Sequence, residues 1–345
     1  MKKITVTDAY LEVQTREYNY RLIPITEEII RCITSKKEII EDTHSLMIEA
    51  FVGRGEYPPV KFEVCQDMDS VCLKTAGVQA EIVPETGAVS WKHGDGRAWA
   101  AEMGRELSKT DVFHYTTGDE EPVIHRVKTV DGERNFIQNL KEVKDREAYR
   151  GRIFFRWEDG EGIYGLGQAE EGIYNYRGHN QFLYQHNMRI PMPLFVSDKG
   201  YGVLVDCCSL MVFHDEVSDK KEQEAKESYL FLDTVDQIDT YFLGGGSMDG
   251  VIHDYRYLTG KAQLLPKWAY GYVQSKEQYY TARELVEIVQ RYRKERIPLD
   301  LVVQDWNTWE PGNWGEKILD RNRYGDMKEC AEEINRMNAH TMVSV

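Results

Sequence analysis

The chain has 345 residues, of which 41% are hydrophobic and 29% charged, a composition that supports a packed core and excludes extended disorder. Its formal net charge of −15 argues against a nucleic-acid partner, because phosphate binding requires a basic surface. No window has the apolar length of a membrane span, and Met1–Asp8 leads into no apolar signal-peptide core, so we expect a cytoplasmic protein. The 21 Tyr and 7 Trp leave two interpretations open, sugar binding and ordinary packing in strands and cores.

Residues 1–265 predict an antiparallel β-sandwich domain, because short alternating runs are separated by turns rich in Asp, Gly and Pro. Ser197–Gly200 is predicted to be a hairpin turn, Asp215–Lys226 a solvated loop, and Thr26–Cys32 a helix. The predicted strands are Phe62–Cys65, Val71–Lys74, Val78–Val83, Arg152–Trp157, Leu194–Ser197, Tyr201–Asp206 and Ile238–Leu243.

The cysteines predict neither a metal site nor a disulfide framework. They are scattered, without CxxC spacing and without histidines at zinc-site intervals. Adjacent Cys207 and Cys208 would point to opposite faces of a strand. We therefore expect reduced structural thiols and no metal or cofactor. The six cysteines are Cys32, Cys65, Cys72, Cys207, Cys208 and Cys330.

Residues 266–345 change to alternating strands and helices. Apolar residues recur at helical spacing from Leu285 to Tyr292, after a predicted N-cap at Thr281 and a capping box completed by Glu284. The order strand, helix, strand, helix, strand predicts a parallel α/β unit, the incomplete start of a (β/α)8 barrel that three strands cannot close. The predicted strands are Trp268–Gln274, Leu299–Val303 and His340–Val345, and the predicted helices are Thr281–Arg293 and Met327–Met337.

Polar and aromatic side chains directly follow the predicted strand Leu299–Val303, at Asp305, Trp306 and Trp309. In a barrel of this kind, residues just past the carboxyl end of a strand form the active-site rim. A carboxylate can accept hydrogen bonds from sugar hydroxyls while flat indole faces cover the apolar face of the ring. The alternative is an aspartate that caps the next loop, beside tryptophans that only pack, and the residues alone favour neither.

Three further motifs predict no nucleotide or serine-hydrolase site. The glycines of Tyr164–Gln168 open no helix, Gly244–Ser247 lacks the Lys-Ser/Thr of a phosphate loop, and no GxSxG occurs. His253 and Asp254 have no matching nucleophile and are predicted to be polar packing. The polar loop Glu170–Asn187 is either a plain connection or a functional loop, as loops of this length often are.

Several segments together resemble glycoside hydrolase family 31, the retaining α-glucosidases and α-xylosidases. They follow the family's order over residues 160–345, and Gln274–Glu277 with Val303–Trp306 is most similar to the bacterial α-xylosidase branch. Arg323–Asp326 stands where the family has an Arg-Phe-Pro-Asp-like run. The other matching segments are Tyr164–Gly167, Tyr257–Gly260, Leu265–Gly271, Gln274–Tyr279 and Ile297–Asp305.

The resemblance implies a β-sandwich, a (β/α)8 barrel and C-terminal β domains, of which this chain would be the N-terminal portion. It implies that Asp305 binds outer hydroxyls of the sugar in the −1 subsite, with Trp306 and Trp309 as a wall beside it. Glu277 occupies the place of a wall residue after the first barrel strand. Asn187, or a neighbour in the same loop, would be the contribution of the sandwich to the pocket.

The family's catalytic pair is not among these residues, since its nucleophilic aspartate follows the fourth barrel strand and its acid/base aspartate lies further on. Retaining hydrolysis needs two carboxyls about 5 Å apart. We therefore expect the N-terminal part of an exo-acting α-glycosidase that removes terminal α-xylosyl or α-glucosyl residues from oligosaccharides, xylose being favoured, and we expect this chain alone to be inactive. The alternative is a non-catalytic or vestigial carbohydrate-binding protein. Exposed strand edges would make the isolated chain poorly soluble or cause it to associate with further copies.

Overall fold

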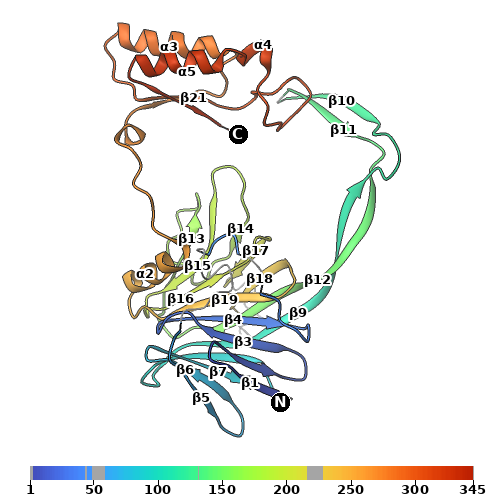
Figure 1. The fold of residues 1–345 in the computed structure, drawn as a ribbon, viewed down its shortest axis with the longest axis vertical. Helices are drawn as coiled ribbons and strands as arrows, with labels where there is room; N and C mark the ends of the chain where they lie inside the picture. The colour runs from blue at the N-terminus through green and yellow to red at the C-terminus, as the bar shows by residue number, and fades with distance from the viewer. Residues whose placement is uncertain (1–2, 43–44, 49–58, 131, 216–227, 345) are drawn as a thin grey trace. The chain divides into compact units, whose positions relative to one another are not determined.

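The computed structural model describes residues 3–42, 45–48, 59–130, 132–215 and 228–344. The chain divides into two compact units (Figure 1). The first comprises Met1–Phe113 and Lys144–Ala262, and the second comprises His114–Val143 and Gln263–Val345. Residues 114–143, which lie inside the predicted sandwich domain, thus group with the segment predicted to begin a barrel.

The first unit is built on two large antiparallel sheets. The eight-stranded sheet has the order β1 (Lys3–Val6), β2 (Leu11–Gln14), β3 (Asn19–Pro24), β4 (Ile29–Ser35), β19 (Ile238–Leu243), β16 (Gly202–Val205), β15 (Ile190–Ser197) and β13 (Ile163–Gln168). The nine-stranded sheet has the order β14 (Gln181–Leu183), β17 (Met211–His214), β18 (Ser228–Val235), β12 (Lys141–Arg156), β9 (Ala98–Thr116), β8 (Ala88–His93), β7 (Val78–Val83), β6 (Val71–Lys74) and β5 (Glu63–Gln66).

The main core lies between these two sheets, because one continuous buried cluster draws apolar side chains from both. Trp91 of β8 stacks on Phe242 of β19 with ring centroids 4.3 Å apart, so the sheets meet through their inward faces. The predicted antiparallel sandwich is therefore confirmed. Strands Val71–Lys74, Val78–Val83 and Ile238–Leu243 have the predicted bounds.

The helix predicted at Thr26–Cys32 is wrong. Thr26 lies in the turn between β3 and β4, where its Oγ1 accepts hydrogen bonds from the backbone N–H groups of Glu28 and Ile29 at 3.1 Å. Every residue of β4 is buried, because the sandwich core covers one face of the strand and a second apolar cluster covers the other. A strand buried on both faces has no alternation in its sequence, so it resembled a short apolar helix.

Helix α2 (Met248–Thr259) was not predicted. It follows the Gly244–Gly246 run at the end of β19, and its N-cap Ser247 accepts a hydrogen bond from the backbone N–H of Gly250 at 3.1 Å. Val251 and Leu258 join the second apolar cluster, on the outer face of the eight-stranded sheet (Figure 1). Only this narrow stripe marks the helix in the sequence.

Asp254 of α2 is buried, with its Oδ1 3.5 Å from Nδ1 of His253. Burial raises the pKa of the Asp254 carboxyl to about 6, and His253 opposes this shift while Glu28 adds to it. A carboxyl whose pKa is raised in the folded state favours folding while it is protonated, and this contribution is lost as the pH rises through the folded-state pKa.

We therefore expect Asp254→Asn to change stability in a pH-dependent way. Below pH 4 the variant and the parent should unfold at similar urea concentrations, because both carry a neutral side chain. Above pH 6 the variant should be more stable by about 2 kcal/mol, because it avoids a buried charge. Urea unfolding at pH 4, 5.5 and 7.5 measures this difference. Asp249→Asn, at an exposed position of the same helix, is the control and should not become more stabilising with pH.

The second unit contains a three-stranded parallel sheet, in the order β20 (Val273–Gln274), β21 (Leu301–Gln304) and β22 (His340–Val343). Helices α3 (Ala282–Lys294) and α5 (Met327–Arg336) lie side by side against this sheet (Figure 1), and their apolar residues share one buried cluster with Val302. The short α4 (Arg321–Tyr324) precedes α5. The predicted order of strands and helices is confirmed.

Some details of the second unit differ from the prediction, since β21 begins at Leu301 and not at Leu299. Residues Trp268–Tyr270 belong to the 3-10 helix η1 (Lys267–Tyr270), and only Val273–Gln274 form the strand. The predicted N-cap is confirmed, since Thr281 Oγ1 accepts from the N–H of Glu284 at 3.3 Å. The Glu284 carboxylate, however, accepts from the N–H of Tyr280 at 2.7 Å and not from that of Thr281.

The second unit also contains the hairpin of β10 (Ile124–Thr129) and β11 (Gly132–Ile137), which lies in the chain between the long strands β9 and β12.

None of the described helices combines the length and the apolar character needed to cross a bilayer.

Candidate carbohydrate site

The candidate site lies where the parallel strands of the second unit end. Val273 pairs with Leu301 and Gln274 with Val302, so β20 and β21 run in one direction and their carboxyl ends share one edge of the sheet. The segments that follow these two strands carry Glu277 and Asp305 respectively. Side chains past the carboxyl ends of parallel strands form the rim at which such sheets bind their ligands.

Asp305 begins the loop after β21 and is partly buried. Among the described residues, none donates a hydrogen bond to its carboxylate. The preceding Gln304 is fully buried, and its Nε2 lies 3.3 Å from both the carbonyl oxygen of Tyr279 and the hydroxyl of Tyr324. Gln304 thus fixes the start of the loop while the carboxylate of Asp305 keeps its acceptor capacity for a ligand.

Three tryptophans form one cluster in this loop. The ring centroids of Trp306 and Trp309 are 6.1 Å apart, and Trp314 lies 5.1 Å from Trp306 and 5.6 Å from Trp309. The three ring planes are inclined by 52–55° to one another, between the stacked and the edge-to-face arrangement, and the centroid distances lie within the usual range of about 4.5–7 Å for aromatic contacts. Trp314 is 43% exposed. Sequence reasoning missed Trp314, although its spacing from Trp306 and Trp309 within one loop was a usable signal.

An ion pair holds the far end of the loop. Arg323 Nε lies 2.8 Å from Asp320 Oδ2, and Arg323 also donates to the carbonyl oxygen of Trp309. The backbone N–H of Asp320 donates to the carbonyl oxygen of Thr308 at 2.7 Å. The hydrogen bond from Arg323 lowers the pKa of the Asp320 carboxyl. Asp320 is therefore structural, whereas the carboxylate of Asp305 remains available.

The structure brings Asp305, Trp306 and Trp309 together on one loop, and it places Glu277 after the neighbouring strand. Glu277 is exposed and has no hydrogen-bond or ion-pair partner among the described residues. Asn187 is exposed and belongs to the first unit, next to Met188, whose φ is +66°. The roles assigned to these five residues remain predictions.

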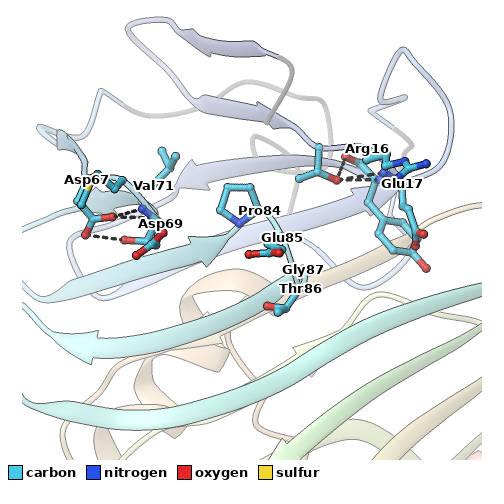
Figure 2. A pocket seen from close by; sticks show the side chains of 13 residues that line it. Arg16, Glu17, Asp67, Asp69, Val71, Pro84, Glu85, Thr86 and Gly87 are labelled. Carbon is cyan, nitrogen blue, oxygen red and sulfur yellow. Dashed lines mark hydrogen bonds between the residues drawn. The ribbon is translucent and has the colours of Figure 1, made fainter.

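A groove of about 520 Å³ in the first unit is a weaker candidate (Figure 2). Several of its polar side chains are already used within the turns. Asp67 Oδ1 accepts from the N–H groups of Asp69 and Ser70 at 2.9 and 2.6 Å, and Thr15 Oγ1 accepts from that of Tyr18 at 3.0 Å. The lining turns are Thr15–Tyr18, Asp67–Val71 and Pro84–Gly87.

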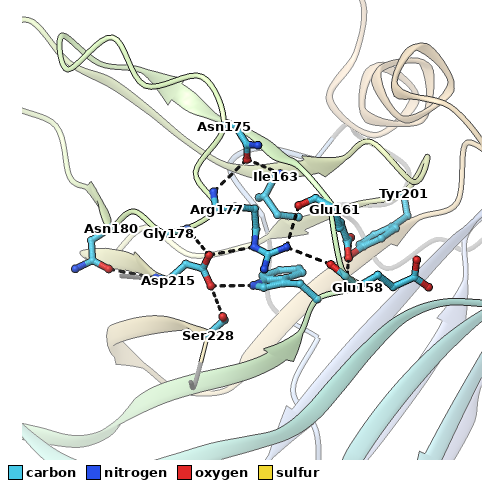
Figure 3. Close-up of polar contacts among 11 residues, drawn as sticks. Glu158, Glu161, Ile163, Asn175, Arg177, Gly178, Asn180, Tyr201, Asp215 and Ser228 are labelled. Atoms are coloured by element: carbon cyan, nitrogen blue, oxygen red, sulfur yellow. Dashed lines mark hydrogen bonds and ion pairs between the residues drawn. The ribbon is translucent and has the colours of Figure 1, made fainter. Parts of the chain in front are cut away.

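Asp215 organises the polar loop that follows β13 (Figure 3). It is buried, so its predicted place in a solvated run is wrong, while residues 216–226 of that run lie outside the described residues. Its carboxylate accepts from Nε of Arg177 at 3.1 Å, the N–H of Gly178 at 2.6 Å, Nε1 of Trp157 at 3.2 Å and the hydroxyl of Ser228. Two of these four donors, Arg177 and Gly178, lie in the Glu170–Asn187 loop, so the Asp215 carboxylate anchors the base of that loop.

A second buried carboxylate, Glu161, supports the same loop (Figure 3). It accepts hydrogen bonds from the hydroxyls of Ser197 and Tyr201, both at 2.6 Å, while Arg177 donates to its backbone carbonyl at 2.8 Å. Burial, together with the charge of Glu161, raises the pKa of Tyr201. Neither Glu161 nor Asp215 is free for a ligand.

Cys207 and Cys208, expected on a strand, instead follow β16.

The alternating strands and helices of residues 263–345, with a carboxylate and indoles past the strand ends, define the beginning of a TIM-barrel domain. Residues 262–345 match the model of the glycosyl hydrolases family 31 TIM-barrel domain. This segment belongs to that family's barrel domain, and the chain as a whole is a relative of family 31 α-glycosidases.

The relatives include α-xylosidases and α-glucosidases. The chain is 36% identical over 217 residues to an α-xylosidase of Saccharolobus solfataricus, covering 60% of this chain and 29% of that protein. It is 27% identical over 200 residues to α-glucosidase 2 of Bacillus thermoamyloliquefaciens, covering 55% of this chain and 25% of that protein.

Two solved structures share the fold. The family 31 α-xylosidase of Xanthomonas citri matches with a TM-score of 0.72 at 21% identity, covering 99% of this chain and 49% of that one. A soil-metagenome family 31 α-xylosidase in complex with xylose matches with a TM-score of 0.73 at 20% identity, covering 100% of this chain and 47% of that one. The chain thus spans under a third of these two sequence relatives and about half of these two solved structures.

Proposed function

We propose that the chain is the part of an exo-acting α-glycosidase that comprises the β-sandwich and forms one side of the sugar-binding pocket. Its ligand is a terminal α-linked xylosyl or glucosyl residue of an oligosaccharide, with xylose favoured. The observation that carries the proposal is the carboxylate of Asp305, which is unused by the described protein groups and stands at the start of a loop with three indoles. A cytoplasmic location is part of the same proposal.

The chemistry of the loop fits a sugar better than other small ligands. A carboxylate can accept charge-assisted hydrogen bonds from two vicinal hydroxyls of a sugar. Each hydrogen bond to a charged group contributes roughly 1.5–3 kcal/mol. The indole faces of Trp306 and Trp309 offer apolar area to the C–H face of the ring. Gln304 and the Asp320–Arg323 pair fix both ends of the loop, so less ordering entropy is lost on binding.

The preference for xylose rests on similarity to proteins named α-xylosidases. A wall close to C5 of the sugar would exclude the hydroxymethyl group of glucose, and a shape-based choice of this kind discriminates by only about 10- to 200-fold. Comparing methyl α-D-xyloside with methyl α-D-glucoside measures that ratio directly.

We expect Asp305→Ala to weaken binding of methyl α-D-xyloside by at least about ten-fold, the effect of one lost charge-assisted hydrogen bond. Isothermal titration or tryptophan fluorescence measures the dissociation constant. Glu310→Ala is the matched control, because Glu310 is an exposed carboxylate of the same loop, and it should bind as the parent does. Equal affinity in the Asp305 variant would remove Asp305 from the site.

The same proteins should be assayed for release of 4-nitrophenol from its α-xyloside and α-glucoside. We propose that the 345 residues alone release none, because the family's catalytic aspartates follow later barrel strands. Sugar binding without hydrolysis would agree equally with the alternative, a non-catalytic carbohydrate-binding protein. Hydrolysis that disappears in Asp305→Ala would instead show that two carboxylates within these residues perform the reaction, and our placement of the site would be wrong.

A further inference from the structure

The β10–β11 hairpin contacts the tryptophan loop within the second unit. Arg134 of β11 forms a parallel bridge with Gly312, and Asn135 Nδ2 lies 3.4 Å from Asn313 Oδ1. Gly312 has φ +93°, and a Cβ at this position would come within 3.1 Å of Nε of Arg126 and Oδ1 of Asn135. The positive φ favours glycine at this position, whereas the two side-chain atoms could move aside from a Cβ.

Arg134 also contacts an indole of the candidate site. The centre of its guanidinium lies 3.8 Å from the ring centroid of Trp314, well inside the range of about 6 Å for a cation–π contact. Trp314 in turn touches Trp306 and Trp309. One planar cation thus holds the outermost member of the tryptophan cluster.

A loop of this kind needs such support. The segment from Asp305 to Asp320 contains neither helix nor strand, and ordering its residues costs conformational entropy that binding would otherwise have to offset. Gln304 and Arg323 fix its two ends, whereas the hairpin contacts its middle, at Gly312–Trp314.

We propose that the β10–β11 hairpin is a positioning element of the sugar site and that Arg134 is its positioning residue. Arg134 holds the indole of Trp314, and through it those of Trp306 and Trp309, in the orientation that a terminal α-linked sugar meets beside Asp305. This inference rests on the proposed function of the loop. It extends the site to a segment that precedes Asp305 by about 170 residues. No pattern in the sequence relates that segment to Asp305.

The test compares Arg134→Ala, Arg134→Lys and Lys128→Ala in the full chain. Lys128 is an exposed cation on the other strand of the same hairpin and serves as the matched control. We expect Arg134→Ala to change the near-ultraviolet circular dichroism of the tryptophans and to weaken binding of methyl α-D-xyloside by about three- to ten-fold, the scale of a cation–π contact. Arg134→Lys should change the circular dichroism and the affinity less than Arg134→Ala does. Lys128→Ala should change neither the circular dichroism nor the affinity.

A double-mutant cycle with Trp314→Ala separates positioning from a general loss of stability. If Arg134 acts through Trp314, replacing Arg134 in the Trp314→Ala background should cause no further loss of affinity. Undiminished affinity in Arg134→Ala, or an equal loss in both backgrounds, would overturn the inference. Absence of xyloside binding in the parent chain would instead overturn the proposed function, so the two failures are distinguishable. Thermal melts of each variant, together with Arg134→Lys, show whether a loss of affinity comes from unfolding of the chain.

Discussion

Arg105→Ala should lower the free energy of unfolding by about 3–5 kcal/mol, because it leaves a buried carboxylate without its counter-ion. Arg105 and Glu102 are 0% and 1% exposed, and two hydrogen bonds of 2.7 and 3.0 Å join them. Nε1 of Trp91 donates to the same carboxylate at 2.9 Å. The remaining guanidinium donors reach Thr34 and Thr240, on β4 and β19 of the opposite sheet. The pair therefore ties the two sheets together through the core.

Urea unfolding followed by tryptophan fluorescence measures this loss. Arg152→Ala is the matched control, since Arg152 and Glu106 form an ion pair on strands of the same sheet but are 46% and 43% exposed. An exposed pair contributes about 0–1 kcal/mol. Glu102→Gln combined with Arg105→Met should be less damaging than Arg105→Ala, because no unpaired charge remains and the Gln carbonyl can still accept from Trp91. A double variant as unstable as the single one would contradict this account.

Asp215→Ala should lower the free energy of unfolding by about 3 kcal/mol and release the base of the Glu170–Asn187 loop. The substitution removes the shared acceptor of Arg177, Trp157, Gly178 and Ser228, of which the Arg177 interaction is an ion pair. Each donor left unpaired in a buried place costs roughly 1–3 kcal/mol, although relaxation of the loop recovers part of that cost.

Hydrogen exchange of the loop amides distinguishes local release from global destabilisation. We expect faster exchange at Tyr176–Asn180 in Asp215→Ala even at urea concentrations where the sandwich stays folded. Asp215→Asn should fall between the parent and the alanine variant, because the amide oxygen still accepts hydrogen bonds without the charge. Asp198→Ala, at an exposed position in the β15–β16 turn, should change stability by less than about 0.5 kcal/mol. Unchanged exchange in Asp215→Ala would show that other contacts hold the loop.

The sequence was sufficient wherever a pattern is local. Val78–Val83 alternates in its side-chain types, and the strand buries every second residue, because a sheet with one inward face requires this period. Thr281 and the apolar spacing after it predicted α3, since capping and helical periodicity act within one or two turns. The carboxylate and indoles after β21 followed from the same logic, because strand ends in a parallel sheet lie at one edge.

Tertiary structure decided what depends on distant segments. β4 is a strand because apolar layers cover both of its faces, and this removes the alternation that would have identified it. Asp215 is a structural acceptor because folding brings Arg177 and Trp157 to it, so its acidic and basic neighbours in the sequence were misleading. Arg134 lies on Trp314 because folding brings a hairpin from one part of the chain beside a loop from another. Contacts between segments so far apart arise from packing of the whole fold, and no local pattern encodes them.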